Sequence, residues 1–168
     1  MKKAWLALAL VALLLPSAAR GDDPPVVEHQ QALCTVPGKV ISLCAAISDD
    51  VAVATARIYF RREGENYYNF VDMTFTGVNY CGTIPAPREG KIEVIEYYVQ
   101  AEDNAYQPTR TSTFRLPVKF EAVCEFPPLE RNAARAAAIK VKATSRKQGK
   151  KLDDAFVATG VTFVPAAQ

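Results

Sequence analysis

The chain has 168 residues, of which 49% are hydrophobic and 23% are charged. This apolar share is that of a globular protein, which excludes disorder over most of the chain as well as collagen-like and coiled-coil compositions. The 20 Lys and Arg nearly balance the 18 Asp and Glu. That balance argues against a nucleic-acid partner, which rewards a strong positive surplus.

The N-terminus predicts a secretory signal peptide over residues 1–19. Lys2 and Lys3 precede an unbroken apolar run from Ala4 to Leu15, and small residues follow it, as expected before a cleavage site. A membrane anchor is the alternative, but a span needs about 20 apolar residues. We therefore expect an exported chain, periplasmic or at the cell surface, with no transmembrane segment after cleavage.

Residues 20–31 are polar and predict a flexible leader. This leader contains His29, the only histidine of the chain, which we interpret as a solvated side chain. A Ser–His–Asp or Cys–His catalytic device needs a positioned base. We therefore do not expect His29 to take part in catalysis.

Residues 32–126 contain short segments of alternating polarity separated by turn residues, which is typical of an antiparallel β-sandwich or barrel. The predicted strands span residues 39–47, 54–62, 68–75, 80–84, 92–101 and 111–118. In the second strand, Ala54, Ala56, Ile58 and Phe60 are expected to face the core. The residues between them then point outward, as a half-buried strand requires.

Residues 127–168 differ in character from the region before them. They hold 8 basic and 3 acidic residues, whereas residues 20–126 hold 10 basic and 15 acidic residues. We expect a basic extension of small, mixed α/β structure. Its Ala-rich start favours a helix, and the predicted elements are a short helix over 129–139, a weak strand over 139–144, a basic loop over 145–151 and one or two strands over 155–164.

Three stretches of the middle region carry a family resemblance. They read DDVAVATARIYFRREG, MTFTGVNYCGTIPAP and IEYYVQAEDN. The strand end at Phe60-Arg61, the Tyr80 ahead of Ile84-Pro85 and the Tyr97-Tyr98 strand that leads to Ala-Glu-Asp resemble the immunoglobulin-like, fibronectin type III-like domains of bacterial exported proteins. The resemblance covers residues 35–120 and implies an all-β, immunoglobulin-like antiparallel β-sandwich. Because such sandwiches host unrelated roles, it implies architecture and no particular function.

Four cysteines in an exported chain predict two disulfides, and three pairings are open. In an immunoglobulin-like sandwich the second and fifth strands are neighbours in one sheet. Alternation along the strands points Cys44 and Cys81 outward, because their sequence neighbours face the core. On adjacent strands these two can pair, which leaves Cys34 and Cys124 to tie the ends of the sandwich together. A redox or zinc site is the alternative, but the chain has no CxxC and no closely spaced ligand pairs.

Adjacent acidic residues at Asp49-Asp50, Glu102-Asp103 and Asp153-Asp154 are candidates for acid–base chemistry or for calcium. We interpret them as solvated, because the sequence has no loop of regularly spaced Asp and Asn with the oxygen count that calcium needs. No Gly-rich phosphate loop occurs either. We therefore expect neither an enzyme nor a cofactor or metal site.

Two sets of side chains remain as candidates for binding. The basic set suits an acidic partner, although it can also be a solvated loop that packs on the protein's own acidic body; it comprises Lys140, Lys142, Arg146, Lys147, Lys150 and Lys151. The tyrosine set suits stacking on a sugar ring, although strands favour Tyr in any case; it comprises Tyr59, Tyr67, Tyr68 and Tyr106. We expect a non-catalytic binding or structural module of the cell envelope that contacts another envelope protein, with a glycan-binding accessory module as the alternative.

Overall fold

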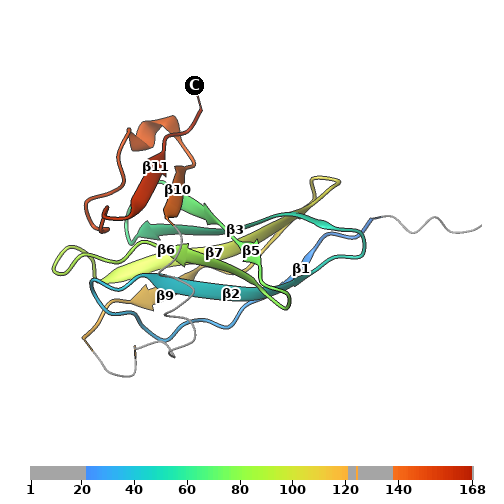
Figure 1. Cartoon of the computed structure of the whole chain (residues 1–168), viewed down its shortest axis with the longest axis horizontal. Coiled ribbons are helices and arrows are strands. Elements are labelled where there is room, and N and C mark those ends of the chain that lie inside the picture. The colour runs from blue at the N-terminus through green and yellow to red at the C-terminus, as the bar shows by residue number, and fades with distance from the viewer. Residues whose placement is uncertain (1–21, 121–123, 125–137, 168) are drawn as a thin grey trace, which may run out of the picture.

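The computed structural model describes residues 22–120, 124 and 138–167. These residues form an almost entirely β-structure in which two sheets share one apolar core (Figure 1). The predicted signal peptide, residues 1–19, lies outside the described residues, as does the predicted helix up to residue 137. No helix within the described ranges is long and apolar enough to cross a membrane.

The smaller sheet has four antiparallel strands in the order β1-β2-β6-β5. Their bounds are β1 Val26–Glu28, β2 Ile41–Ser48, β5 Thr74–Phe75 and β6 Tyr80–Ile84. Ile41, Leu43 and Ala45 alternate into the core, as the period-two pattern predicted. Strand β1 lies inside the predicted flexible leader, so that prediction was wrong for this part: three residues were enough to pair with the edge of β2.

The larger sheet runs in the order β11-β10-β4-β3-β7-β8, and β9 also pairs with β7. Its strands are β3 Val53–Arg62, β4 Asn69–Asp72, β7 Val94–Asp103, β8 Pro108–Arg110, β9 Phe114–Pro117, β10 Ile139–Ala143 and β11 Val161–Val164. The predicted strand over 68–75 is divided, because the chain leaves the larger sheet at Asp72 and enters the smaller one at Thr74. Ala54 is exposed rather than inward, because the β3–β7 register shifts between Val53 and Thr55.

The two sheets meet over side chains that are fully buried, among them Ile58, Phe60 and Tyr97 from the larger sheet. On the smaller sheet, Gly82 permits this close approach. A Cβ at Gly82 would lie 2.8 Å from Ile58 Cδ1, nearer than packed carbon atoms tolerate.

The C-terminal segment continues the larger sheet instead of forming a separate layer. Strand β10 pairs antiparallel with β4, and β11 pairs parallel with β10. The weak strand predicted over 139–144 is thus confirmed, whereas only Val161–Val164 of the predicted 155–164 region is a strand. Phe156 instead inserts into the core and meets Phe60 edge-on at 5.2 Å.

All four cysteines form the two predicted disulfides. Cys44 and Cys81 are register partners on β2 and β6, with their Cα atoms 4.1 Å apart. Cys34 pairs with Cys124 across 90 residues of sequence. Two disulfides are typical of a protein that folds in an oxidising compartment outside the cytoplasm.

His29 is a half-buried side chain with both ring nitrogens in hydrogen bonds, so its interpretation as a solvated leader residue was wrong. Its Nδ1 donates to the Cys44 carbonyl oxygen at 2.8 Å. A carbonyl oxygen can only accept, so the one N–H of the neutral ring is on Nδ1. Nε2 therefore accepts a hydrogen bond from the Tyr97 hydroxyl at 3.0 Å. Burial lowers the pKa of His29, offset in part by its bond to Cys44, and burial raises the pKa of Tyr97 to about 12. Both groups are therefore neutral in the folded protein near pH 7.

The Cys44–Cys81 bridge is expected to stabilise the fold mainly by restricting the unfolded chain. Replacing both cysteines by Ala should lower the free energy of unfolding by about 4 kcal/mol on the chain-entropy model, measured by urea denaturation. The matched control is Ser42→Ala with Thr83→Ala, a cross-strand pair two positions further along the same ladder. A loss below about 1 kcal/mol, or one equal to the control, would contradict the assigned role.

The neutral state of His29 predicts a pH dependence of stability. Because its native pKa lies below the unfolded value, the unfolded chain binds a proton that the native chain does not. Stability from His29 is thus complete above about pH 6.5 and is lost as the pH falls through the lowered native pKa. The difference in unfolding free energy between the parent and His29→Gln should shrink on acidification. A difference that stays constant or grows between about pH 8 and pH 5 would rule this out.

Candidate functional site

The outward face of the larger sheet carries a row of aromatic side chains. Lys142, Phe70, Tyr59 and Tyr98 are register partners across β10, β4, β3 and β7. All four are half-buried. They point away from the core because Ile58, Phe60 and Val99, which alternate with them, point into it.

The rings of this row contact one another. Tyr59 and Tyr98 stack with centroids 4.8 Å apart and planes 9° apart. On the other side of Tyr59, the Phe70 ring centroid lies 5.4 Å from that of Tyr59, and Tyr68 meets Tyr98 edge-on at 5.0 Å. These cross-strand contacts join three strands into one aromatic surface.

Cations cover the rings. The guanidinium of Arg61 lies 4.3 Å from the Tyr68 centroid, that of Arg57 lies 5.0 Å from Phe70, and that of Arg110 lies 5.2 Å from Tyr98. Lys142 Nζ lies 5.5 Å from Phe70. These are cation–π distances. We call this surface the aromatic–cationic face; its members are Arg57, Tyr59, Arg61, Tyr68, Phe70, Tyr98, Arg110 and Lys142.

Two carboxylates of the same surface neutralise part of its positive charge. Asp72 lies 3.5 Å from Arg57 and 2.6 Å from Lys142, and Glu96 lies 2.7 Å from Arg61. Cations still outnumber carboxylates, so the face is complementary to an acidic surface. Burial, followed by the neighbouring Tyr59, raises the pKa of Tyr98, while Arg110 lowers it. Tyr98 therefore stays neutral at physiological pH.

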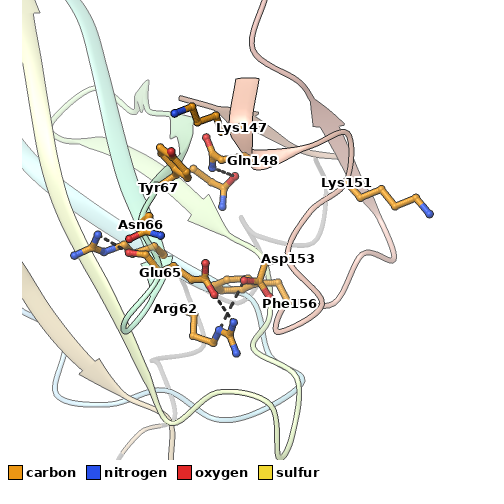
Figure 2. Close-up of a pocket in the computed structure, with 11 residues that line it drawn as sticks. Arg62, Glu65, Asn66, Tyr67, Lys147, Gln148, Lys151, Asp153 and Phe156 are labelled. Carbon is orange, nitrogen blue, oxygen red and sulfur yellow. Dashed lines mark hydrogen bonds and ion pairs between the residues drawn. The ribbon is translucent and has the colours of Figure 1, made fainter. Parts of the chain in front are cut away.

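A pocket of about 280 Å³ adjoins this face (Figure 2). It lies between the turn that follows β3 and the loops of the C-terminal segment, and Arg61 lines it as well as covering Tyr68. Arg62 lies between Glu65, to which it is hydrogen-bonded, and Asp153 at 3.7 Å. Figure 2 shows Lys151 extending away from the other side chains. Most side chains that line the pocket are polar or charged, and the ring of Phe156 contributes apolar surface.

Gln148 fixes the outer wall of the pocket to the sheet. It belongs to a short 3-10 helix, Arg146–Gln148, which begins with a capping box on Ser145. The Gln148 side-chain amide donates to the Tyr68 carbonyl and to Asn69 Oδ1, both at 3.0 Å. Its Oε1 accepts from the Ser145 backbone N–H at 2.7 Å. One side chain thus joins the C-terminal segment to β4.

The predicted basic set is divided among different surroundings. Lys142 belongs to the aromatic–cationic face, and Lys147 and Lys151 line the pocket. Arg146 donates to the Ala167 carbonyl at 2.8 Å. Lys140 and Lys150 are exposed.

The predicted tyrosine set is divided as well. Tyr59 and Tyr68 belong to the face, and Tyr67 lines the pocket. Tyr106 is 81% exposed in the turn between β7 and β8. Three cations that sequence reasoning did not consider for binding belong to the face: Arg57, Arg61 and Arg110. The rings of Phe70 and Tyr98, which lie on predicted strands, complete it. A signal was present, since Arg57, Tyr59 and Arg61 alternate on the outward side of one predicted strand.

Comparison with known proteins gave no match to a family model and none to a curated protein. The function is therefore argued from this face and the pocket beside it.

The structure predicts that Gln148 controls local order of the C-terminal segment. Gln148→Ala should speed amide hydrogen exchange over residues 139–149 by about tenfold, the effect of losing a hydrogen bond worth about 1.4 kcal/mol. Exchange in β3 and β7 should not change. The control is Lys150→Ala, an exposed neighbour. Mass spectrometry measures both variants, and equal exchange in the two would contradict the assigned role.

Proposed function

We propose that this protein is an exported, non-catalytic binding module of the cell envelope that recognises a partner protein through the aromatic–cationic face. The observation that carries this proposal is the interleaving of Arg and Tyr on a half-exposed sheet surface. Tyr and Arg are the residues that most often dominate the binding energy of protein interfaces. On this face they are held in place by stacking, so little side-chain entropy is lost on binding.

The charge of the face specifies the kind of partner. Arg57, Arg61, Arg110 and Lys142 bring more positive charge than Asp72 and Glu96 offset. Arg can bind a carboxylate through two parallel hydrogen bonds while it remains stacked on a ring. The favoured partner surface is therefore acidic and carries apolar groups that pack between the guanidinium groups. The adjoining pocket can accept one polar side chain of that partner.

A glycan partner is supported less well. Sugar stacking needs a ring with a free face, but Tyr59 and Tyr98 cover each other, and Arg61 and Arg110 lie over Tyr68 and Tyr98. Tyr106 is exposed, but it lies in the β7–β8 turn and not on the face. A glycan-binding accessory module remains the alternative, to be separated by experiment.

We also infer that the fold is immunoglobulin-like. The order β1-β2-β6-β5 corresponds to strands A, B, E and D of that fold, and β8-β7-β3 corresponds to G, F and C. One feature departs from the antibody pattern: Cys44–Cys81 joins neighbours within one sheet, where antibody domains join the two sheets. In this interpretation β4, β10 and β11 extend the sheet beyond strand C and widen the proposed binding surface.

Two further observations support the assignment to an exported, non-catalytic protein. Both disulfides suit an oxidising compartment, in agreement with the predicted signal peptide. The only histidine has both ring nitrogens in hydrogen bonds to Cys44 and Tyr97, which makes it a structural residue and not a general base.

Site-specific photo-crosslinking tests the proposal. A benzophenone amino acid at Tyr68, on the face, should give a protein adduct in an envelope extract of the producing cells. The same amino acid at Phe75, an exposed aromatic residue of the smaller sheet, should not. Arg110→Glu combined with the Tyr68 probe should reduce the adduct at least about tenfold, because it inverts the charge that an acidic partner meets.

The chemical nature of the adduct separates the two candidate functions. Digestion by protease and resistance to glycosidases support the proposed function, whereas the reverse supports the glycan-binding alternative. The absence of an adduct at Tyr68, or equal adducts at Tyr68 and Phe75, would overturn the proposed face.

A further inference from the structure

Three aspartates converge at the end of the two sheets where the described chain begins, at the right of Figure 1. Asp22 precedes β1, and Asp49 and Asp50 form the turn between β2 and β3. One carboxylate oxygen from each lies within 4.8 Å of the other two. Like charges at this separation repel, so the arrangement needs an explanation.

A fourth aspartate, Asp103, lies beside this cluster and provides an independent observation. It ends β7, and its residue is fully buried, at 0% exposure. Its Oδ1 accepts from the Gln107 backbone N–H at 2.8 Å, but its Oδ2 has no hydrogen-bond partner. The Gln107 side chain donates to the Asp22 carbonyl at 2.9 Å, which brings Asp103 and Asp22 together. A buried carboxylate oxygen without a partner is costly and rare.

Two carboxylate oxygens within the cluster itself also lack hydrogen-bond donors. Asp22 Oδ1 and Asp49 Oδ2 are buried and have no hydrogen-bond partner. Asp49 Oδ1 accepts from the backbone N–H groups of Val51 and Ala52 at 2.9 and 2.7 Å, which orients this carboxylate. Burial, together with the charges of Asp103, Asp50 and Asp49, raises the pKa of Asp22.

No Lys or Arg in the described part of the chain makes an ion pair with any of these four aspartates. Within the described residues, no basic side chain therefore compensates their charges through an ion pair. Three buried oxygens that lack donors, drawn from three separate segments, call for a positive charge between them.

We propose that Asp22, Asp49, Asp50 and Asp103 form a binding site for Ca²⁺. Calcium takes six to eight oxygen ligands in flexible geometry, and carboxylates are its usual protein ligands. Asp22, Asp49 and Asp50, whose carboxylate oxygens lie within 4.8 Å of one another, supply part of that shell. Asp103 adds negative charge beside it, and water or backbone carbonyls complete the shell. Mg²⁺ demands near-octahedral geometry and gives up its water reluctantly, so four carboxylates from three segments favour the larger ion.

The consequence of binding is structural. The ion would join the segment before β1, the β2–β3 turn and the end of β7, whose carboxylates otherwise repel one another. Bound Ca²⁺ would therefore hold Asp22 and the segment before β1 against the two sheets and stabilise the fold by mass action.

The test uses the purified, disulfide-bonded protein after removal of divalent ions with EDTA. Titration with CaCl₂ in a calorimeter should show one site with a Kd of about 0.1–1 mM, the range of extracellular calcium modules. At about 10 mM CaCl₂ the Tm should rise by about 5–10 °C. MgCl₂ at the same concentration should give a smaller rise.

Three variants decide whether the aspartates form the site. Asp50 is exposed, so Asp50→Asn should fold and should weaken Ca²⁺ binding at least about tenfold, because a charged ligand is lost. Asp103→Asn should abolish the Ca²⁺-dependent rise in Tm and, in EDTA, should be at least as stable as the parent, since repulsion is relieved. Asp154→Asn, an exposed member of another Asp-Asp pair, should behave like the parent.

The outcomes are decisive in both directions. A saturable Ca²⁺ signal that is lost in Asp50→Asn and kept in Asp154→Asn establishes the site. The proposal fails if the parent shows no saturable heat and no Ca²⁺-dependent rise in Tm, or if Asp50→Asn and Asp103→Asn keep the full rise.

Discussion

The antiparallel pairing of β3 with β7 is the constraint on which the rest of this structure depends. Its register places Ile58 opposite Val99 and Phe60 opposite Tyr97 on the core side, and Tyr59 opposite Tyr98 on the outward side. A slip of one residue would exchange the two sides, burying Arg57 and Arg61 and exposing the core. The same ladder that closes the apolar core therefore builds the aromatic–cationic face, and one cannot be altered without the other.

Different interactions attach the N-terminal strand and the C-terminal segment to the two sheets. Pairing with β2 and the hydrogen bonds of His29 to Cys44 and Tyr97 fix the N-terminal strand β1 to the smaller sheet and the core, and Cys44–Cys81 joins β2 to β6 within that sheet. On the opposite edge, Gln148 and the pairing of β10 with β4 attach the C-terminal segment. The attached strands cover an edge that would otherwise be open to unwanted pairing. The proposed binding surface thus lies on a rigid scaffold, which lowers the entropy cost of recognition.

Local pattern made much of the fold predictable, and separation in sequence explains what was missed. Alternating polarity located β2, β3, β6 and β7, and the outward position of Cys44 and Cys81 led to the correct disulfides. Strand β1 was missed because three residues are too few to establish a period. The larger sheet's extension by β10, and the meeting of Asp22 with Asp103, depend on contacts between distant segments, which no local pattern contains. The rings of the face were predictable singly, but their stacking with Arg needed the register.

Hydroxyl-radical footprinting of tyrosine side chains tests the central claim, that the outward side of the β3–β7 ladder is the recognition surface. The protein is oxidised alone and after capture of its partner from an envelope extract, and modification is read by mass spectrometry. The account predicts that Tyr59, Tyr68 and Tyr98 become protected while Tyr80 and Tyr106 do not change. Unchanged oxidation of the first three, or protection confined to Tyr80 and Tyr106, would contradict it.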